Sequence, residues 1–357
     1  MKNWLLTSLK KIGSVLGNLF KAIPFGKLKN KGNLKWVMLV LLILFLCISL
    51  VGWFVSREPG IFDVRKVALT HGKTGEEVNV IGFTTTVTLI EVAETLLDKP
   101  GGYLSNDITP PAIFIDNMPS WEFGALIQVR DLTRALRNDM SRSRSQSEEI
   151  LELGEAEPQF NIDNSSWIFP SAEDNYRDGI ASLKKYSDRL VAQNQENVQF
   201  YARADNLRDW LLVVEKRLGG LSQRLSASVG QARINTDLAG DSAATQSTFS
   251  SSEVMVQTPW LKLDNVFYEA RGSTWALLHF LRAIEVDFEG VLEKKNARAL
   301  VSQIIRELEG TQRTVWSPVI LNGNGFGIFA NHSLVMAAYV SRANAAVIEL
   351  RGLLRQG

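Results

Sequence analysis

WVMLVLLILFLCISLVGWFV, the stretch from Trp36 to Val55, contains no charged residue and only one serine and one glycine. A helix rises about 1.5 Å per residue, so a stretch of this length covers the roughly 30 Å hydrocarbon core of a bilayer. Trp36 and Trp53 lie near its two ends, where indole rings favour the interface with the headgroups. No A-x-A-like cleavage site follows, which favours a retained anchor over a signal peptide. The sequence therefore predicts one transmembrane helix over residues 36–55.

The charges on either side of this stretch predict its orientation. Eight lysines and no acidic residue precede it in residues 1–35, which predicts a basic cytoplasmic tail. Without those lysines, 31 basic residues face 38 acidic ones, so residues 36–357 carry a net charge of −7. Phosphate contacts require surplus lysine and arginine, and an acidic domain is therefore a poor nucleic-acid binder. We expect the lipid bilayer as a partner and no nucleic acid.

Residues 1–23 allow two interpretations. Apolar residues recur there at steps of four and three, beginning with Leu5, Leu9 and Ile12, which is typical of a basic amphipathic helix in the headgroup plane. Gly13 and Gly17 favour a flexible basic tail instead.

Cysteine usage limits the chemistry of the chain. The only cysteine, Cys47, lies inside the predicted span, so the outer domain has no disulfide and no thiol chemistry. With about 300 residues beyond the span, a hydrophobic core can supply the stability instead.

Apolar residues beyond the span follow the four–three spacing of amphipathic helices. This spacing predicts helices over residues 84–97, 120–154, 263–291, 296–311 and 331–354. Residues 171–228 fit either one long helix or two shorter ones, and the first begins at a capping motif, Ser171 to Asp174. Residues 61–82 look short-stranded or irregular, because apolar residues alternate there.

Composition divides the chain further. Residues 230–258 are rich in serine and threonine and lack a strong period, which predicts a loop or linker. This segment separates an N-terminal part, residues 56–229, from a C-terminal helical part, residues 259–357. We therefore predict a mainly α fold, in which one transmembrane helix precedes an antiparallel helical bundle with a small irregular or short-stranded N-terminal part.

Motifs for catalysis or metal binding are missing from the sequence. His71, His279 and His332 are the only histidines, and none of them has metal-ligand spacing. The chain has neither a nucleophile elbow nor a phosphate-binding loop. Two acids, Asp116 and Glu122, are too loosely placed to indicate acid–base chemistry. We expect no catalytic residue, no metal, no cofactor and no enzymatic activity.

One histidine and two arginines are interpreted as structural residues of the core. His279 lies on a predicted helix and is interpreted as a hydrogen-bonded core residue. Arg203 and Arg271 each follow a tyrosine, and we interpret them as buried arginines that pair with acids and fix the register of the bundle.

The glycine-rich loop at residues 321–327 offers a candidate binding site. Glycines before a helix N-terminus can cradle an anion. A simple glycine turn with Asn331 as N-cap is the structural alternative. Trp316, Asn331 and His332 are therefore the candidate binding residues.

Several segments resemble a known family. They are SREP at 56–59, GGYLSND at 101–107, DNMPSWEFG at 116–124, FYARADN at 200–206, VFYEARGSTWALLH at 266–279 and ANHSLVMAAYVSRANAA at 330–346. Over nearly the whole chain, they resemble an uncharacterised bacterial membrane family, a domain of unknown function. The resemblance implies a bacterial inner-membrane protein with a periplasmic domain, and it implies no activity.

The function that we expect is a non-enzymatic one. A periplasmic helical bundle tethered to the inner membrane would bind a protein partner or support the envelope. The alternative is a ligand-sensing or lipid-handling domain with a pocket lined by Trp260, Trp275 and Trp316. Such a sensor would work through a membrane partner, because the 35 residues before the span are too few for an output domain.

Overall fold

Helices make up most of the described residues of the computed structural model, which are 31–72, 78, 80–143, 148–192, 198–234 and 253–356. They fall into two units: Met1–Arg57 with Ile108–Ile115, and Glu58–Asp107 with Asp116–Gly357. The two interpretations of residues 1–23 lie outside the described residues. We describe each unit by itself.

The first unit is built on α2 (Lys31–Val55). Within it, Lys35–Val55 is long and apolar enough to cross a membrane, and none of its most apolar window is buried by protein. The short helix η2 (Ala112–Phe114) belongs to the same unit. A methyl group added at Gly52 would lie 3.7 Å from Pro111, which shows that η2 and its neighbours pack beside the end of α2. This unit has the helix that the sequence predicts at residues 36–55.

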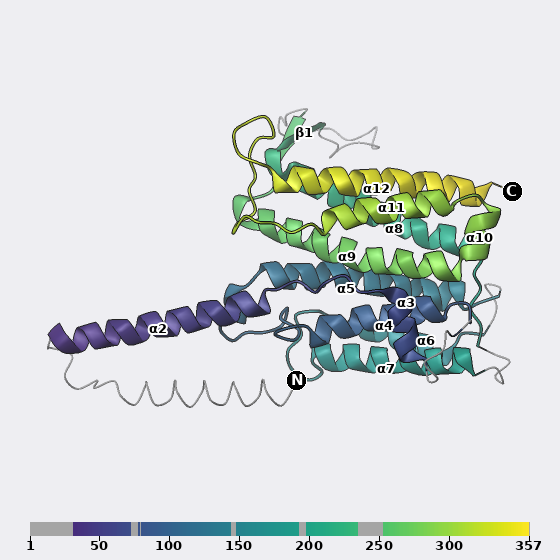
Figure 1. The fold of residues 1–357 in the computed structure, drawn as a ribbon, viewed down its shortest axis with the longest axis horizontal. Helices are drawn as coiled ribbons and strands as arrows, with labels where there is room; N and C mark the ends of the chain where they lie inside the picture. Colours follow the sequence, from purple (N-terminus) through teal and green to yellow (C-terminus); the bar gives the residue numbers. More distant parts are fainter. Residues whose placement is uncertain are drawn as a thin grey trace, which may run out of the picture. The chain divides into compact units, whose positions relative to one another are not determined.

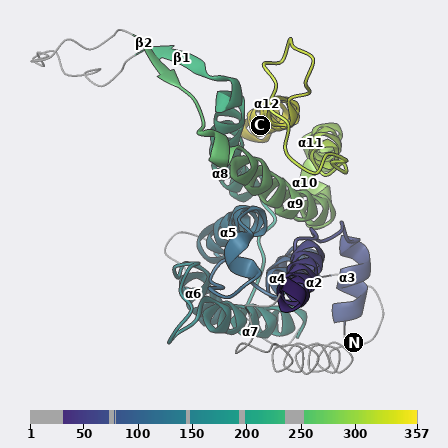
Figure 2. The same cartoon turned by 90° about the vertical axis from the view of Figure 1, so that its left-hand side faces the viewer.

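The second unit begins with α3 (Val64–His71), α4 (Phe83–Asp98), α5 (Asn117–Ala135), the π turn η3 (Leu136–Met140), α6 (Leu151–Phe160) and α7 (Ala172–Val191). It continues with α8 (Ala204–Ser226), η4 (Ala227–Val229), β1 (Gln231–Ile234), β2 (Glu253–Val256), η5 (Trp260–Lys262), α9 (Leu263–Asp287), α10 (Glu289–Lys294), α11 (Arg298–Thr311) and α12 (His332–Arg355). Two groups of helices, α3 to α7 and α8 to α12, meet along α5 and α9 (Figures 1 and 2). Within each group most neighbouring helices are antiparallel, whereas α5 and α9 run in the same direction (Figure 1).

The seam between α5 and α9 requires glycine. A Cβ atom at Gly272 would lie 1.9 Å from the carbonyl oxygen of Trp121, and one at Gly124 would lie 2.0 Å from that of Glu269. The missing side chains let the two backbones approach, and the indole rings of Trp121 and Trp275 then pack with centroids 5.0 Å apart. Both rings are buried, so this seam is the centre of the core.

Several predictions about the elements are confirmed. The fold is mainly α, and Ser171 caps α7 by accepting a hydrogen bond from the Asp174 amide at 3.1 Å. Residues 171–228 form two helices, α7 and α8, rather than one. The best-patterned helix of the sequence, at 263–291, is realised as α9 and α10.

Three predictions differ from the structure. Within residues 61–82, which were expected to be short-stranded or irregular, Val64–His71 form the helix α3, and Asp63 caps it by accepting from the Arg65 amide at 2.9 Å; residues 73–77 and 79 lie outside the described residues. The helix predicted over 120–154 is broken, since its first part ends in the π turn η3 and α6 begins at Leu151. The loop predicted over 230–258 begins and ends in strands, and β1 and β2 pair antiparallel there. Residues 144–147 and 235–252 lie outside the described part of the chain.

Candidate functional site

A pocket of about 350 Å³ lies between α9, α11 and α12, where α9 and α12 begin and α11 ends. Its walls are mainly apolar and aromatic, and include Phe267, Trp316, Val335, Met336 and Tyr339. Apolar walls with a few polar groups are typical of small-molecule sites.

Close packing of α11 on α12 shapes this pocket. The ring of Tyr339 lies against Gly310, where an added Cβ atom would come within 2.3 Å of the ring. Any side chain at Gly310 would therefore move the ring of Tyr339, which lines the pocket.

His332 supplies a polar group to the pocket wall. Its Nδ1 accepts a hydrogen bond from the Leu321 amide at 3.1 Å, which leaves the proton of the neutral ring on Nε2. Partial burial lowers the pKa of His332, and so favours this neutral form. Of the described residues, none accepts a hydrogen bond from Nε2, and His332 thus presents one donor to a ligand.

Asn331 is buried and holds the loop before α12. Its Oδ1 accepts from the Leu334 amide at 2.8 Å, and its Nδ2 donates to the Gly323 carbonyl at 2.6 Å. The prediction that Asn331 is the N-cap is confirmed. Asn331 does not line the pocket.

The glycine loop is arranged as a turn. The Gly323 amide donates to the Ala330 carbonyl at 3.0 Å, and the Phe326 amide donates to Asn324 Oδ1 at 3.1 Å. These amides are thus already paired, which favours the glycine turn over an anion cradle.

Arg271 holds the pocket in place. Its guanidinium forms a two-point ion pair with Glu58, with Nε 2.7 Å from Oε1, and donates to the carbonyls of Thr311 and Arg313 at 3.0 and 2.8 Å. The prediction of a buried, acid-paired arginine is confirmed for Arg271, although Glu58 lies outside a helix. Because four of its five N–H donors are occupied, Arg271 positions the wall more than it recognises a ligand.

Arg313 is the exposed cation at this pocket. It lies 5.9 Å from the ring of Tyr339, and no carboxylate of the described residues lies within 4.0 Å of it. A pocket with apolar walls, one neutral donor and one exposed cation suits a ligand with an apolar body and an anionic or accepting group.

Arg203 differs from the prediction. It is exposed, and it pairs with Asp205 at 3.5 Å and with backbone carbonyls near residue 142. Among the described residues it forms no buried pair with a facing helix, because its position just before α8 leaves the side chain at the surface.

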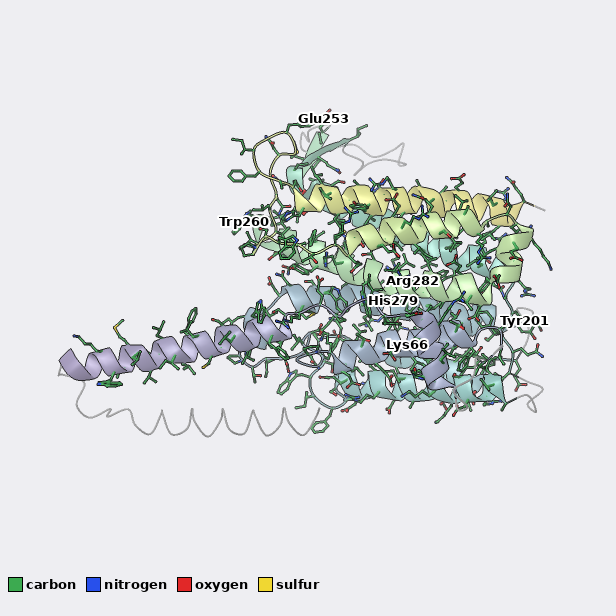
Figure 3. All side chains as sticks on the ribbon, viewed as in Figure 1. Lys66, Tyr201, Glu253, Trp260, His279 and Arg282 are labelled. Carbon is green, nitrogen blue, oxygen red and sulfur yellow. The ribbon has the colours of Figure 1, made fainter. Side chains whose placement is uncertain are left out.

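The three tryptophans of the predicted pocket do not come together. Trp316 lines the pocket and is 92% exposed, whereas Trp275 is buried in the seam between α5 and α9. Trp260 lies on η5 and is exposed, outside the pocket wall (Figure 3). Sequence spacing could not predict this separation, because the three tryptophans lie on different elements: η5, α9 and the loop after α11.

His279 is a core histidine, as predicted. Its Nε2 accepts from the Phe62 amide at 3.0 Å, its Nδ1 lies 2.7 Å from the Trp275 carbonyl, and its ring stacks on Phe62. One neutral tautomer satisfies both contacts, with the proton on Nδ1. Burial lowers the pKa of His279 to about 4, so the ring stays neutral near neutral pH.

A buried ion pair between Lys99 and Glu122 was missed by sequence reasoning. Glu122 also accepts hydrogen bonds from the Leu104 amide at 2.9 Å and from the Ser105 amide at 2.8 Å. Burial raises the pKa of Glu122, and Lys99 opposes that shift. These contacts fix the loop after α4, so Glu122 has a structural role rather than the acid–base one that was considered.

His71, Glu91 and Glu94 form another cluster that the sequence did not indicate. Their potential ligand atoms all lie within 4.8 Å of one another. His71 Nε2 lies 3.5 Å from Glu91, and Lys184 pairs with Glu94. The two carboxylates therefore already have partners within the protein, His71 for Glu91 and Lys184 for Glu94.

Comparisons with known proteins leave the activity open. No curated protein and no solved structure matches the chain. A family model described as "Uncharacterized protein conserved in bacteria (DUF2333)" matches residues 28–357, which include α2 and the whole second unit. This match agrees with the resemblance found in the sequence. The chain belongs to DUF2333, an uncharacterised protein family conserved in bacteria.

Proposed function

We propose that this protein is a non-enzymatic binding component of the bacterial envelope. In this proposal α2 crosses the inner membrane, the basic N-terminal tail lies in the cytoplasm, and the second unit lies in the periplasm. There it binds a protein partner or supports the envelope structure.

The observation that carries the proposal is the exposure of α2. Lys35–Val55 has a mean hydropathy of 2.9, and its most apolar window is entirely unburied. An apolar surface of that size in water is unfavourable, and a bilayer covers it. The family match includes this helix.

The second unit supports binding more than catalysis. Its buried ionisable groups Glu122, Arg271 and His279 all make structural contacts. The surface left for function is thus formed by loops and by the pocket.

The test uses reporter fusions to the C-terminus of the full chain, followed by crosslinking in cells. We expect a periplasm-dependent reporter to be active, a cytoplasm-dependent one to be inactive, and crosslinking to capture one reproducible protein. The reverse reporter pattern overturns the topology, and the lack of any reproducible crosslink overturns the protein-binding role.

A second candidate function is favoured by the pocket. Its apolar walls, the Nε2 donor of His332 and the exposed charge of Arg313 suit a lipid or another anionic amphiphile. In that case the protein is a ligand-sensing or lipid-handling domain that works through a membrane partner.

Native mass spectrometry of the full chain tests this candidate. Val335→Trp places a larger ring on the pocket wall, whereas Ile348→Trp places the same ring on the same helix outside the pocket wall; both positions are exposed. We expect a co-purifying lipid to be lost from the first variant and kept by the second. Equal lipid content in both variants rules out the pocket as the lipid site.

A further inference from the structure

Exposed apolar side chains lie in three loops at one end of the second unit. They come from three segments that are distant in the sequence, and each of these side chains is at least 55% exposed. We call this set the loop-end patch, and it consists of Trp167, Phe169, Trp260, Leu261, Phe326 and Ile328. These large apolar side chains are left in contact with water at this end of the unit.

Two of these segments lie where α9 and α12 begin. Trp260 and Leu261 are in η5, which leads directly into α9 (Figure 3). Phe326 and Ile328 are in the loop before α12. That loop follows α11, whose end is tied to α9 where Arg271 donates to the carbonyl of Arg313.

The third segment, the connection between α6 and α7, lies at the same end. Asn106 donates from Nδ2 to the Ser166 carbonyl at 2.8 Å, and the neighbouring Ser105 amide donates to Glu122 on α5. Next to Glu122, Trp121 packs on Gly272 of α9. Figure 2 looks onto this end.

The chain enters the second unit at this end. Glu58 is its first residue, and its carboxylate is held by Arg271 in the first half of α9. Only Ser56 and Arg57 separate Glu58 from the last residue of α2. A membrane that holds α2 therefore has the loop end tethered next to it.

Charged residues of both signs are exposed at each end. At the far end, the turn between α9 and α11 exposes Glu289, Glu293 and Lys294, and the exposed Arg298 pairs with both glutamates. At the loop end, Lys262 is exposed next to Leu261 and Arg313 in the loop before α12, whereas Asp163 is exposed near Trp167. Aromatic residues flanked by cations suit the boundary between acyl chains and anionic headgroups.

We infer that the loop-end patch inserts into the lipid leaflet from which α2 emerges, so that the second unit docks on the membrane surface. This inference rests on the proposed function, because it requires α2 to lie in a membrane. The occupant of the patch is thus the lipid surface and not a soluble protein.

The test places fluorophores on the full chain in nanodiscs of phosphatidylethanolamine and phosphatidylglycerol. Native Cys47 is labelled in the unchanged protein to report on α2. Phe169→Cys and Phe326→Cys, each combined with Cys47→Ser, carry the same dye on the patch. Glu293→Cys with Cys47→Ser is the control, because Glu293 is exposed on α10 at the far end.

Nitroxide-labelled lipids are the quencher. We expect at least twofold quenching at positions 169 and 326, with blue-shifted emission, and no quenching at position 293. Quenching at Cys47 alone overturns the docking and leaves the membrane anchor intact. A blue shift without lipid quenching at 169 and 326 means that a protein covers the patch, and this also overturns the docking. Loss of quenching at Cys47 overturns the proposed function itself.

Discussion

Replacing His279 with glutamine should remove a pH dependence from the stability of the second unit. In the folded protein, His279 Nε2 accepts from the Phe62 amide at 3.0 Å, and a protonated ring has no lone pair for that bond. Desolvation is the largest cause of the lowered pKa, and the charge of Arg282 adds to it. Glutamine has one acceptor and one donor group, so it can replace both contacts of the neutral ring.

The size of the effect follows from the shift in pKa from 6.5 to about 4. The unfolded chain takes up the proton below its own pKa, whereas the folded chain resists it until about pH 4. The contribution of neutral His279 to the free energy of unfolding is therefore fully present above the unfolded pKa of 6.5, and it is lost as the pH falls from there to about 4. At about 1.4 kcal/mol per unit, the loss is about 3 kcal/mol.

The assay is urea unfolding of the full chain in a mild detergent, for wild type and His279→Gln, from about pH 7 to about pH 4. Other titrating groups, including the buried Asp287, are common to both proteins and cancel in the difference. We expect the wild type to lose about 3 kcal/mol more than the variant over this range. Parallel curves would refute a neutral, hydrogen-bonded His279 as the cause.

Three further substitutions test the packing. Gly272→Ala should destabilise the second unit by about 2 kcal/mol or more in thermal unfolding, because the seam has no room for a methyl group. Gly290→Ala, where nothing lies within 4 Å, is the neutral control. Asn331→Ala should cost about 1 to 2 kcal/mol in the same measurement through the lost cap, and unchanged stability would contradict that role. Lys99→Met should cost about 3 to 5 kcal/mol in urea unfolding, since it leaves a buried carboxylate unpaired, and adding Glu122→Gln should restore part of the loss.

The local sequence pattern was sufficient to predict those helices and helix starts that depend on contacts between residues close in the sequence. The four–three spacing predicted α9, α11 and α12, and Ser171 and Asn331 marked true helix starts. The helix α3 was missed although Asp63 is a good N-cap, because the alternating apolar residues after it also fit a strand. The break after α5 was missed because a π turn leaves no clear trace in composition.

The site was less predictable, because tertiary contacts build it. Two of the candidate binding residues, Trp316 and His332, both line the pocket, and they flank one loop. Phe267 and Arg271 join them only through the packing of α9, which no local spacing encodes. In the same way, the partner of Arg271 lies 213 positions away at Glu58.

The pocket and the loop-end patch share one loop, and this links the two proposals. Trp316 on the pocket wall and Phe326 in the patch both lie in the connection between α11 and α12. If that loop meets the leaflet, an amphiphile can pass from lipid to the apolar wall of Phe267 and Met336 with little exposure to water. Burial of its apolar part favours this transfer, and the exposed charge of Arg313 can keep an anionic head at the membrane surface. Docking and lipid binding should therefore be lost together when the loop becomes polar, whereas a protein partner on another face should still be captured.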